Sequence, residues 1–155
     1  KDICVVTNLP YYITSKIITK IVSSSTPINR LVAMVQKEVA LKLCSEEKSP
    51  LKMMIDYVGD VQYELNVPRH VFMPAPHVDS AVISIHKERV ISQELIDLIE
   101  ASYTAKRKTL YNNLKSLYHD QTKEVLESCG IPANKRAEEL NIDDYIRILE
   151  RSHTL

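Results

Sequence analysis

Apolar residues in the first part of the chain form short continuous runs, separated by segments whose apolar residues recur at helical spacing. Ile3 to Thr7 and Leu31 to Val35 have the length and β-branched content of strands that are buried on both faces. A helix capped by Thr14 or Ser15 is predicted between them, and a second short helix, Lys37 to Cys44, follows. The order strand, helix, strand, helix is typical of a doubly wound α/β sheet.

Two later strand-like runs, Met53 to Val67 and Val78 to Ile85, have no helical pattern between them. Strands that follow each other without a crossover pair in antiparallel fashion, so a hairpin is expected at one edge of the sheet. The predicted fold class is therefore α/β, with a mixed sheet that ends in an antiparallel hairpin.

Towards the C-terminus the pattern changes to four amphipathic helices. Ser92 is predicted to cap the first helix, Gly130 to end the third, and Asn141 to begin the fourth. We therefore place a domain boundary near residue 88, with the last part of an α/β domain at 1–88 and a small all-α domain at 89–155.

Composition excludes several classes of protein. Lys plus Arg and Asp plus Glu both total 20, so net charge favours neither nucleic acid nor membrane as a partner. No stretch approaches the roughly eighteen apolar residues of a membrane span. Three cysteines without paired spacing and five histidines without ligand spacing predict neither disulfides nor a metal site. A soluble cytoplasmic protein without a metal is expected, and the abrupt start and the two glycines suggest a fragment.

The stretch "TNLPYYIT" follows the first predicted strand, at the sheet edge where open α/β sheets bind ligands. The side-chain oxygen of Asn8 and the carbonyl of Leu9 could both accept hydrogen bonds from an aromatic amine and aim its lone pair. Pro10 restricts its own backbone and that of Leu9. Tyr11 could stack on a base, a contact worth roughly 1–3 kcal/mol. The alternative is a strand that ends in a proline turn, with the tyrosines simply packed.

Four further segments follow in order: "MVQKEVALKL", "VFMPAPHVDSAVISI", "AKRKTLYNNL" and "KRAEEL". Together with Asn-Leu-Pro-Tyr, they resemble the bacterial small-subunit ribosomal RNA adenine dimethyltransferase family. The resemblance implies the second half of a Rossmann-like class I methyltransferase sheet, followed by a helical RNA-binding domain. It also implies a monomeric enzyme that uses S-adenosylmethionine to dimethylate two adjacent adenosines near the 3′ end of small-subunit rRNA.

The resemblance also implies roles for individual residues. Asn8 and Leu9 would accept from the target amine, with Pro10 holding the turn and Asn8 also contacting the cofactor. Tyr11 and Phe72, the only phenylalanine, would be the two stacking faces for adenine. The alternative for Phe72 is a hydrophobic plug at a strand junction.

A basic stretch is the candidate RNA-binding surface. Lys106, Arg107, Lys108 and Lys115 lie in a window without acidic residues. Tyr111, Asn112 and Asn113 stand between them, and such a mixture suits phosphate and base contacts. Charge alone favours dipole compensation at a helix end, whereas the resemblance implies contact with rRNA. Lys135 and Arg136 are weaker candidates.

The Gly-rich turn and the acidic strand end that hold the cofactor in such methyltransferases are missing from this sequence. We therefore expect that this polypeptide alone neither binds S-adenosylmethionine measurably nor methylates RNA. Two alternatives stay open: a large-subunit rRNA adenine methyltransferase of the macrolide-resistance type, and a non-catalytic RNA- or ribosome-binding module.

Overall fold

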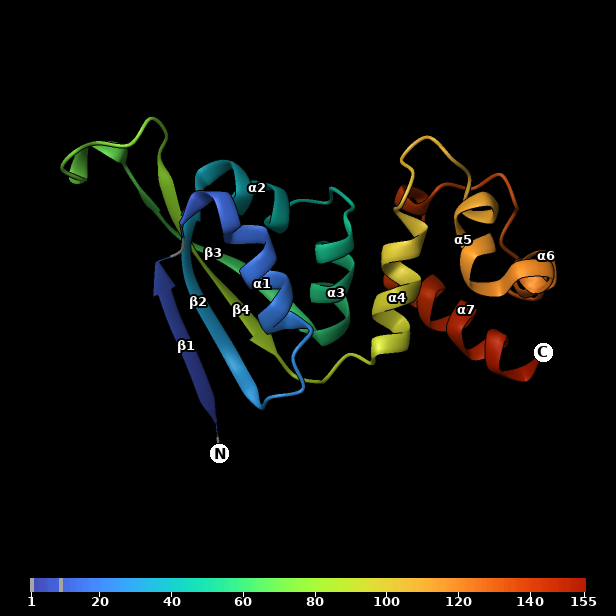
Figure 1. Cartoon of the computed structure of the whole chain (residues 1–155). Coiled ribbons are helices and arrows are strands. Elements are labelled where there is room, and N and C mark those ends of the chain that lie inside the picture. Colours follow the sequence, from blue (N-terminus) through green and yellow to red (C-terminus); the bar gives the residue numbers. More distant parts are fainter. Residues whose placement is uncertain (1, 9) are drawn as a thin grey trace. The chain divides into compact units, whose positions relative to one another are not determined.

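A computed structural model describes residues 2–8 and 10–155, apart from the side chain of Tyr11 (Figure 1). The chain divides into two compact units. The first comprises the residues up to 47 together with 55–90, and the second comprises 48–54 together with 91–155.

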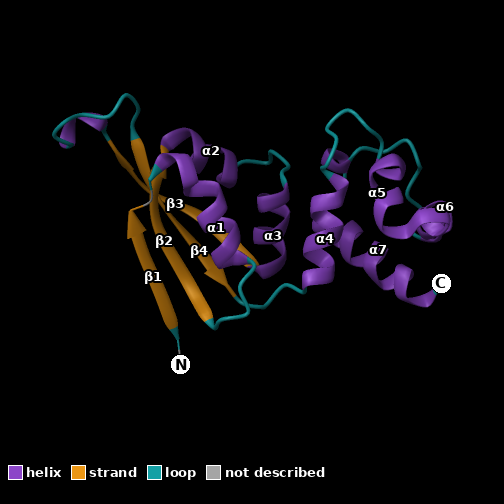
Figure 2. Ribbon diagram, viewed as in Figure 1, coloured by secondary structure: helices purple, strands orange, loops and turns teal. Residues whose placement is uncertain are grey.

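The first unit is built on a four-stranded mixed sheet in the order β1-β2-β4-β3 (Figure 2). The strands are β1 (Ile3–Asn8), β2 (Ile28–Gln36), β3 (Gly59–Val67) and β4 (Ser80–Lys87). β1 and β2 are parallel, whereas β4 runs antiparallel to both β2 and β3. The predicted α/β fold with a late antiparallel hairpin is therefore confirmed.

The helices α1 (Thr14–Val22) and α2 (Lys37–Cys44) follow β1 and β2 and pack against the sheet (Figure 1). Neither Thr14 nor Ser15 caps α1, contrary to the prediction, because a 3-10 turn at Tyr11–Ile13 precedes the helix. The Thr14 hydroxyl already lies within the helical stretch and donates to the carbonyl of Pro10 at 3.1 Å.

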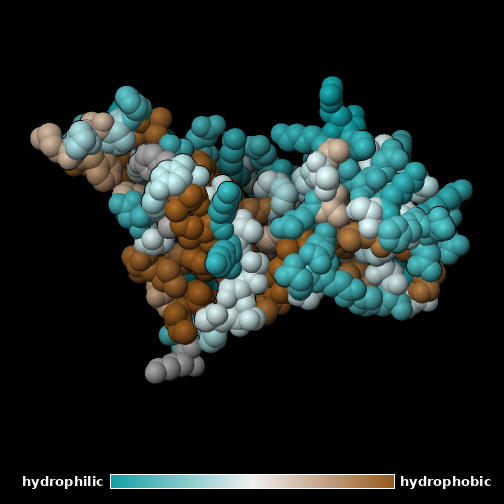
Figure 3. Space-filling model, viewed as in Figure 1, coloured by the Kyte–Doolittle hydropathy of each residue, from teal (hydrophilic) through white to brown (hydrophobic). Residues whose placement is uncertain are grey.

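β1 is not buried on both faces, as its continuous apolar run predicted. Val6 is 75% exposed and Ile3 is 38% exposed. Figure 3 shows hydrophobic side chains at the surface in the region of this strand. The reason is position: β1 lies at the edge of the sheet, and among the described residues no strand pairs with its outer side. Continuous apolar runs predict two buried faces only when layers cover both.

The predicted strand from Met53 to Val67 is wrong in its first half. Pro50–Val58 forms a helix, α3, and only the part from Gly59 onwards is a strand. The hydroxyl of Ser49 accepts the amide N–H of Lys52 at 3.1 Å, and Pro50 occupies the first helical position, where its missing N–H costs nothing. A Ser-Pro start therefore outweighs the strand-like character of the apolar residues.

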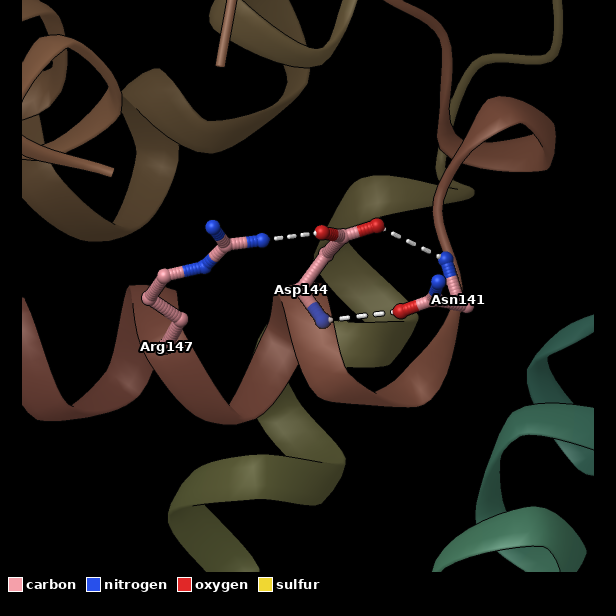
Figure 4. A network of polar contacts seen from close by, with 3 residues as sticks. All are labelled: Asn141, Asp144 and Arg147. Atoms are coloured by element: carbon pink, nitrogen blue, oxygen red, sulfur yellow. Dashed lines mark hydrogen bonds and ion pairs between the residues drawn. The ribbon is translucent and has the colours of Figure 1, made fainter. Parts of the chain in front are cut away.

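Residues 91–155 of the second unit contain four helices, as predicted. They are α4 (Gln93–Ser102), α5 (Leu110–Tyr118), α6 (Thr122–Ser128) and α7 (Ile142–Thr154). Ser92 caps α4 by accepting the N–H of Leu95 at 3.2 Å. Asn141 and Asp144 cap α7 reciprocally, and Asp144 also binds Arg147 (Figure 4). None of the helices that the structure describes is long and apolar enough to cross a membrane.

Candidate functional site

Asn8 is the last residue of β1 and lies at the carboxyl edge of the parallel strand pair. It stands opposite Met34, two residues before β2 ends at Gln36. Its side chain is exposed, and within residues 2–8 and 10–155 it forms no hydrogen bond that would occupy its amide oxygen. The predicted roles of the Leu9 carbonyl and the Tyr11 ring lie outside the described residues.

Pro10 fixes the turn that leads from β1 into α1. Its backbone is extended, with φ of −59° and ψ of 134°. Its carbonyl accepts the N–H of Ile13 at 3.2 Å and the hydroxyl of Thr14 at 3.1 Å. Because the proline ring restricts φ and its carbonyl accepts two hydrogen bonds, the turn from Pro10 into α1 has a fixed geometry.

The loop between β3 and β4, residues 68–79, carries Phe72. It extends from the end of the sheet at which β1 ends in Asn8 (Figure 1). Polar contacts within the loop hold its two arms together. The carboxylate of Asp79 accepts the amide N–H of Arg69 at 2.9 Å, and the Arg69 guanidinium donates to the carbonyl of His77 at 2.7 Å. The carbonyl of Asp79 accepts the N–H of Lys37 at 3.0 Å, which ties the loop to the start of α2.

The strand register relates this loop to Asn8. Asn8 pairs with Met34, and Met34 pairs with Val82, near the start of β4, so two strand spacings separate Asn8 from Val82. At about 4.8 Å per spacing, the separation is about 10 Å. Phe72 is half-buried in the loop. The structure thus places Asn8 and the loop that carries Phe72 at the same end of the sheet.

The predicted RNA-binding residues lie in the second unit. Lys106, Arg107 and Lys108 are exposed in the loop between α4 and α5, where hydrophilic side chains project in Figure 3. Among the described residues, these three side chains form no ion pair. Lys115 is exposed as well, and its ammonium lies 4.6 Å from the centroid of the Tyr111 ring.

Dipole compensation does not account for the position of this basic loop. Lys108 immediately precedes Thr109, which caps the N-terminus of α5 by accepting the N–H of Asn112 at 3.3 Å. A helix N-terminus carries a partial positive charge, so a lysine there is unfavourable for the helix. The basic loop therefore does not stabilise the dipole of α5.

Asn113, in contrast, is committed to the structure of the helical unit. Its side chain is buried and donates to the carbonyls of Ser102 at 2.8 Å and Ala105 at 3.1 Å. These bonds attach the basic loop to the start of α5. Asn112 is exposed and remains available to a partner.

A long-range backbone contact also brings Lys135 and Arg136 to the basic loop. The N–H of Leu110 donates to the carbonyl of Lys135 at 2.6 Å. Glu139 forms an ion pair with Lys135 at 3.5 Å and accepts the backbone N–H of Arg136 at 2.8 Å, and the latter bond lowers the pKa of Glu139. Two basic segments some 25 residues apart in sequence therefore meet, which their separate positions did not reveal.

Comparison with known proteins identifies relatives that cover nearly the whole of this chain. The chain is 37% identical to Ribosomal RNA small subunit methyltransferase A of Fusobacterium nucleatum subsp. nucleatum over 94% of its length. It is 33% identical to the protein of that name from Mesoplasma florum over 98% of its length. It spans about 60% of the length of these two relatives.

Solved structures show the same fold. A dimethyladenosine transferase from Plasmodium falciparum superposes with a TM-score of 0.82 at 24% identity, over 98% of this chain and 67% of that one. The 23S rRNA methyltransferase ErmE gives a TM-score of 0.67 at 21% identity, over 99% of this chain and 66% of that one. The family described as Ribosomal RNA adenine dimethylase matches residues 1–153. The chain therefore belongs to the ribosomal RNA adenine dimethylase family.

Proposed function

We propose that this chain presents the target adenosine and binds RNA in an enzyme that dimethylates two adjacent adenosines near the 3′ end of small-subunit rRNA. The observation that carries the proposal is the exposed Asn8 at the carboxyl edge of β1, followed by the turn that Pro10 fixes. Residues 1–88 would form part of the catalytic domain, and 89–155 would be the RNA-binding domain.

The chemistry of adenine explains why an asparagine is needed there. The lone pair of the exocyclic amine is delocalised into the ring, so the amine is a poor nucleophile. An amide oxygen that accepts an N–H of this amine draws the lone pair back onto nitrogen and fixes its direction. Asn8 would provide this acceptor, and the Leu9 carbonyl would provide a second one. Tyr11 and Phe72 would enclose the flat ring between them.

S-adenosylmethionine is the methyl donor that membership of this family implies, but the described residues of this chain include no Gly-rich turn that would hold it. Its two glycines are used elsewhere: Gly59 begins β3 and Gly130 follows α6. Neither provides a Gly-rich turn at the Asn8 edge. Among the described residues, no group of three or more His, Cys, Asp or Glu side chains could hold a metal ion. These residues account for orienting the amine, not for supplying the methyl group.

The basic loop would hold the RNA while the adenosine is turned out of its stack. Lys106, Arg107, Lys108 and Lys115 would contact phosphates, which position the nucleic acid without reading its sequence. An adenosine in a loop or single-stranded segment leaves its stack at the lowest cost. Ribosomal RNA in the cytoplasm would be the partner of a protein that acts as a monomer.

Substitution of Asn8 in the complete protein tests the proposal. Loss of one preorganised acceptor at a reacting group typically costs 10²–10³-fold in rate, so Asn8→Ala should reduce methylation at least 100-fold. Asn66→Ala is the matched control, since Asn66 is an exposed asparagine on β3. The readout is mass spectrometry of dimethyladenosine in rRNA from cells without their own enzyme. Methylation by Asn8→Ala at the rate of the control would refute the role of Asn8.

The same measurement separates the alternatives. Dimethyladenosine in the large-subunit RNA instead of the small-subunit RNA would support the macrolide-resistance type of enzyme. Absence of dimethyladenosine with the complete wild-type protein, together with salt-dependent RNA binding, would support a non-catalytic RNA-binding module.

A further inference from the structure

A groove of about 390 Å³ in the helical unit lies beside the basic residues and belongs neither to the Asn8 edge nor to the Phe72 loop. Tyr111 of α5, Leu126 of α6 and the segment 131–133 line it, together with Lys123 and Glu127 of α6. We propose that this groove binds one splayed base of single-stranded RNA. This inference rests on the proposed RNA substrate, and it adds a second base-binding site outside the adenine pocket.

The walls of the groove are preformed. α6 ends at Gly130, whose φ of +71° places it in the left-handed region. The N–H of Gly130 donates to the carbonyl of Glu127, and that of Ile131 donates to the carbonyl of Leu126, both at 3.0 Å. This is a Schellman motif, which reverses the chain with fixed geometry. At the other end of the wall, the Lys135 carbonyl accepts the N–H of Leu110.

The lining suits a base. The Tyr111 ring offers an aromatic surface, and base stacking on such rings tolerates any sequence because every base has a π-face. Leu126 and Ile131 are buried beneath and keep the floor apolar. The carboxylate of Glu127 can accept from the N–H groups at a base edge. Glu127 forms an ion pair with Lys123 at 4.0 Å. Both side chains are exposed, so water screens this ion pair and a ligand can separate the two charges at little cost.

Charge identifies the occupant as RNA. The Lys115 ammonium lies 4.6 Å from the centroid of the Tyr111 ring that lines the groove, so it is placed to meet the phosphate of a stacked nucleotide. The basic loop of Lys106 to Lys108 leads directly into α5, whose second residue is Tyr111. Aromatic surface combined with surrounding cations is the arrangement by which proteins bind single-stranded RNA.

A groove-filling substitution tests the proposal on the 155-residue chain itself. Ala133 is exposed, so Ala133→Trp occupies the groove without loss of charge or core packing. Gln93→Trp, at an exposed position of α4 outside the groove, is the matched control. Fluorescence polarisation with a labelled 12-nucleotide single-stranded RNA measures affinity over a range of salt concentrations. We expect Ala133→Trp to weaken binding about 10- to 100-fold, which corresponds to one lost base stack.

The salt dependence distinguishes stacking from phosphate contact. Ala133→Trp should leave the slope of log affinity against log salt unchanged, whereas replacing Lys106, Arg107 and Lys108 by Ala together should reduce it. Tyr111→Phe should bind like the wild type, and Tyr111→Ala should behave like the filled groove.

Several outcomes would overturn the inference. Equal affinity of Ala133→Trp and Gln93→Trp would exclude a base in the groove, as would failure of the wild-type chain to bind the RNA. If Ala133→Trp binds the RNA with unchanged affinity but binds intact small ribosomal subunits more weakly, the groove contacts a ribosomal protein and not an RNA base. Each of these results leaves the methylation by the Asn8 edge to its own test, because that readout is the dimethyladenosine content of rRNA.

Discussion

Replacement of Asn113 by Ala tests whether this side chain holds the basic loop. Its amide donates to the carbonyls of Ser102 at 2.8 Å and Ala105 at 3.1 Å. Of the two residues whose carbonyls accept these bonds, Ser102 is buried and Ala105 is half-buried. Loss of the bond to the half-buried Ala105 costs about 0.5–1.5 kcal/mol net, and the buried carbonyl of Ser102, left without a donor, costs about 1–3 kcal/mol. We therefore expect Asn113→Ala to lower the free energy of unfolding by about 2–4 kcal/mol.

Asn112→Ala is a control of the same residue type at the neighbouring position, which is exposed. A surface substitution of this kind usually changes stability by less than about 0.5 kcal/mol. Urea denaturation followed by circular dichroism gives both values, and the expected loss corresponds to a melting temperature lower by roughly 4–16 °C. If the two variants differ by less than 0.5 kcal/mol, Asn113 does not support the loop in the way that its hydrogen bonds imply.

Two further substitutions test the packing. Among the described residues, the fully buried Tyr145 hydroxyl has no hydrogen-bond partner, although Ser102 and Tyr103 lie near enough to act on its charge. Tyr145→Phe should therefore leave stability unchanged or raise it by about 1 kcal/mol. Burial raises the pKa of Tyr145 in the folded chain, so the unfolded chain releases this proton first. Stability should fall as the pH rises through 10, and less steeply in Tyr145→Phe. At Gly59, a Cβ would lie 1.8 Å from the carbonyl oxygen of His86. Gly59→Ala should cost about 2–3 kcal/mol in urea denaturation, and an unchanged midpoint would refute that close approach.

Much of the fold could be predicted because local signals agreed with the tertiary structure. Ser92 and Asn141 cap the helices that they were predicted to begin, and the parallel strand and the hairpin are where the apolar runs indicated. The segment Pro50–Val58 was predicted in part as a strand but forms α3, and the cause is local. Three consecutive apolar residues, Met53 to Ile55, fit a strand or a helix equally well. The Ser49-Pro50 pair, a helix start, was the signal that could have resolved it.

The other differences depend on contacts that no local pattern encodes. The exposure of Val6 depends on what covers the outer side of β1, and the sequence of a strand does not contain that information. The backbone bond between Leu110 and Lys135 joins segments that are far apart in the chain. Asn112 and Asn113 are identical in type, yet only the fold decides that one is exposed and the other buried. The sequence could therefore indicate which residue types a site would use, but not which individual residues are exposed to a partner and which are buried.

Under the proposed function, the two units would differ in the kind of interaction that they offer to RNA. At the sheet edge, the charge of Arg69 is balanced by Asp79, 3.8 Å away, and the candidate residues Asn8 and Phe72 are uncharged. Hydrogen bonding and stacking there would read a base but add little salt-dependent affinity. In the helical unit, the basic loop has no ion-pair partner among the described residues. Phosphate contacts there would supply affinity without choosing a nucleotide. The choice of adenosine should therefore depend on the first unit, and the strength of binding on the second.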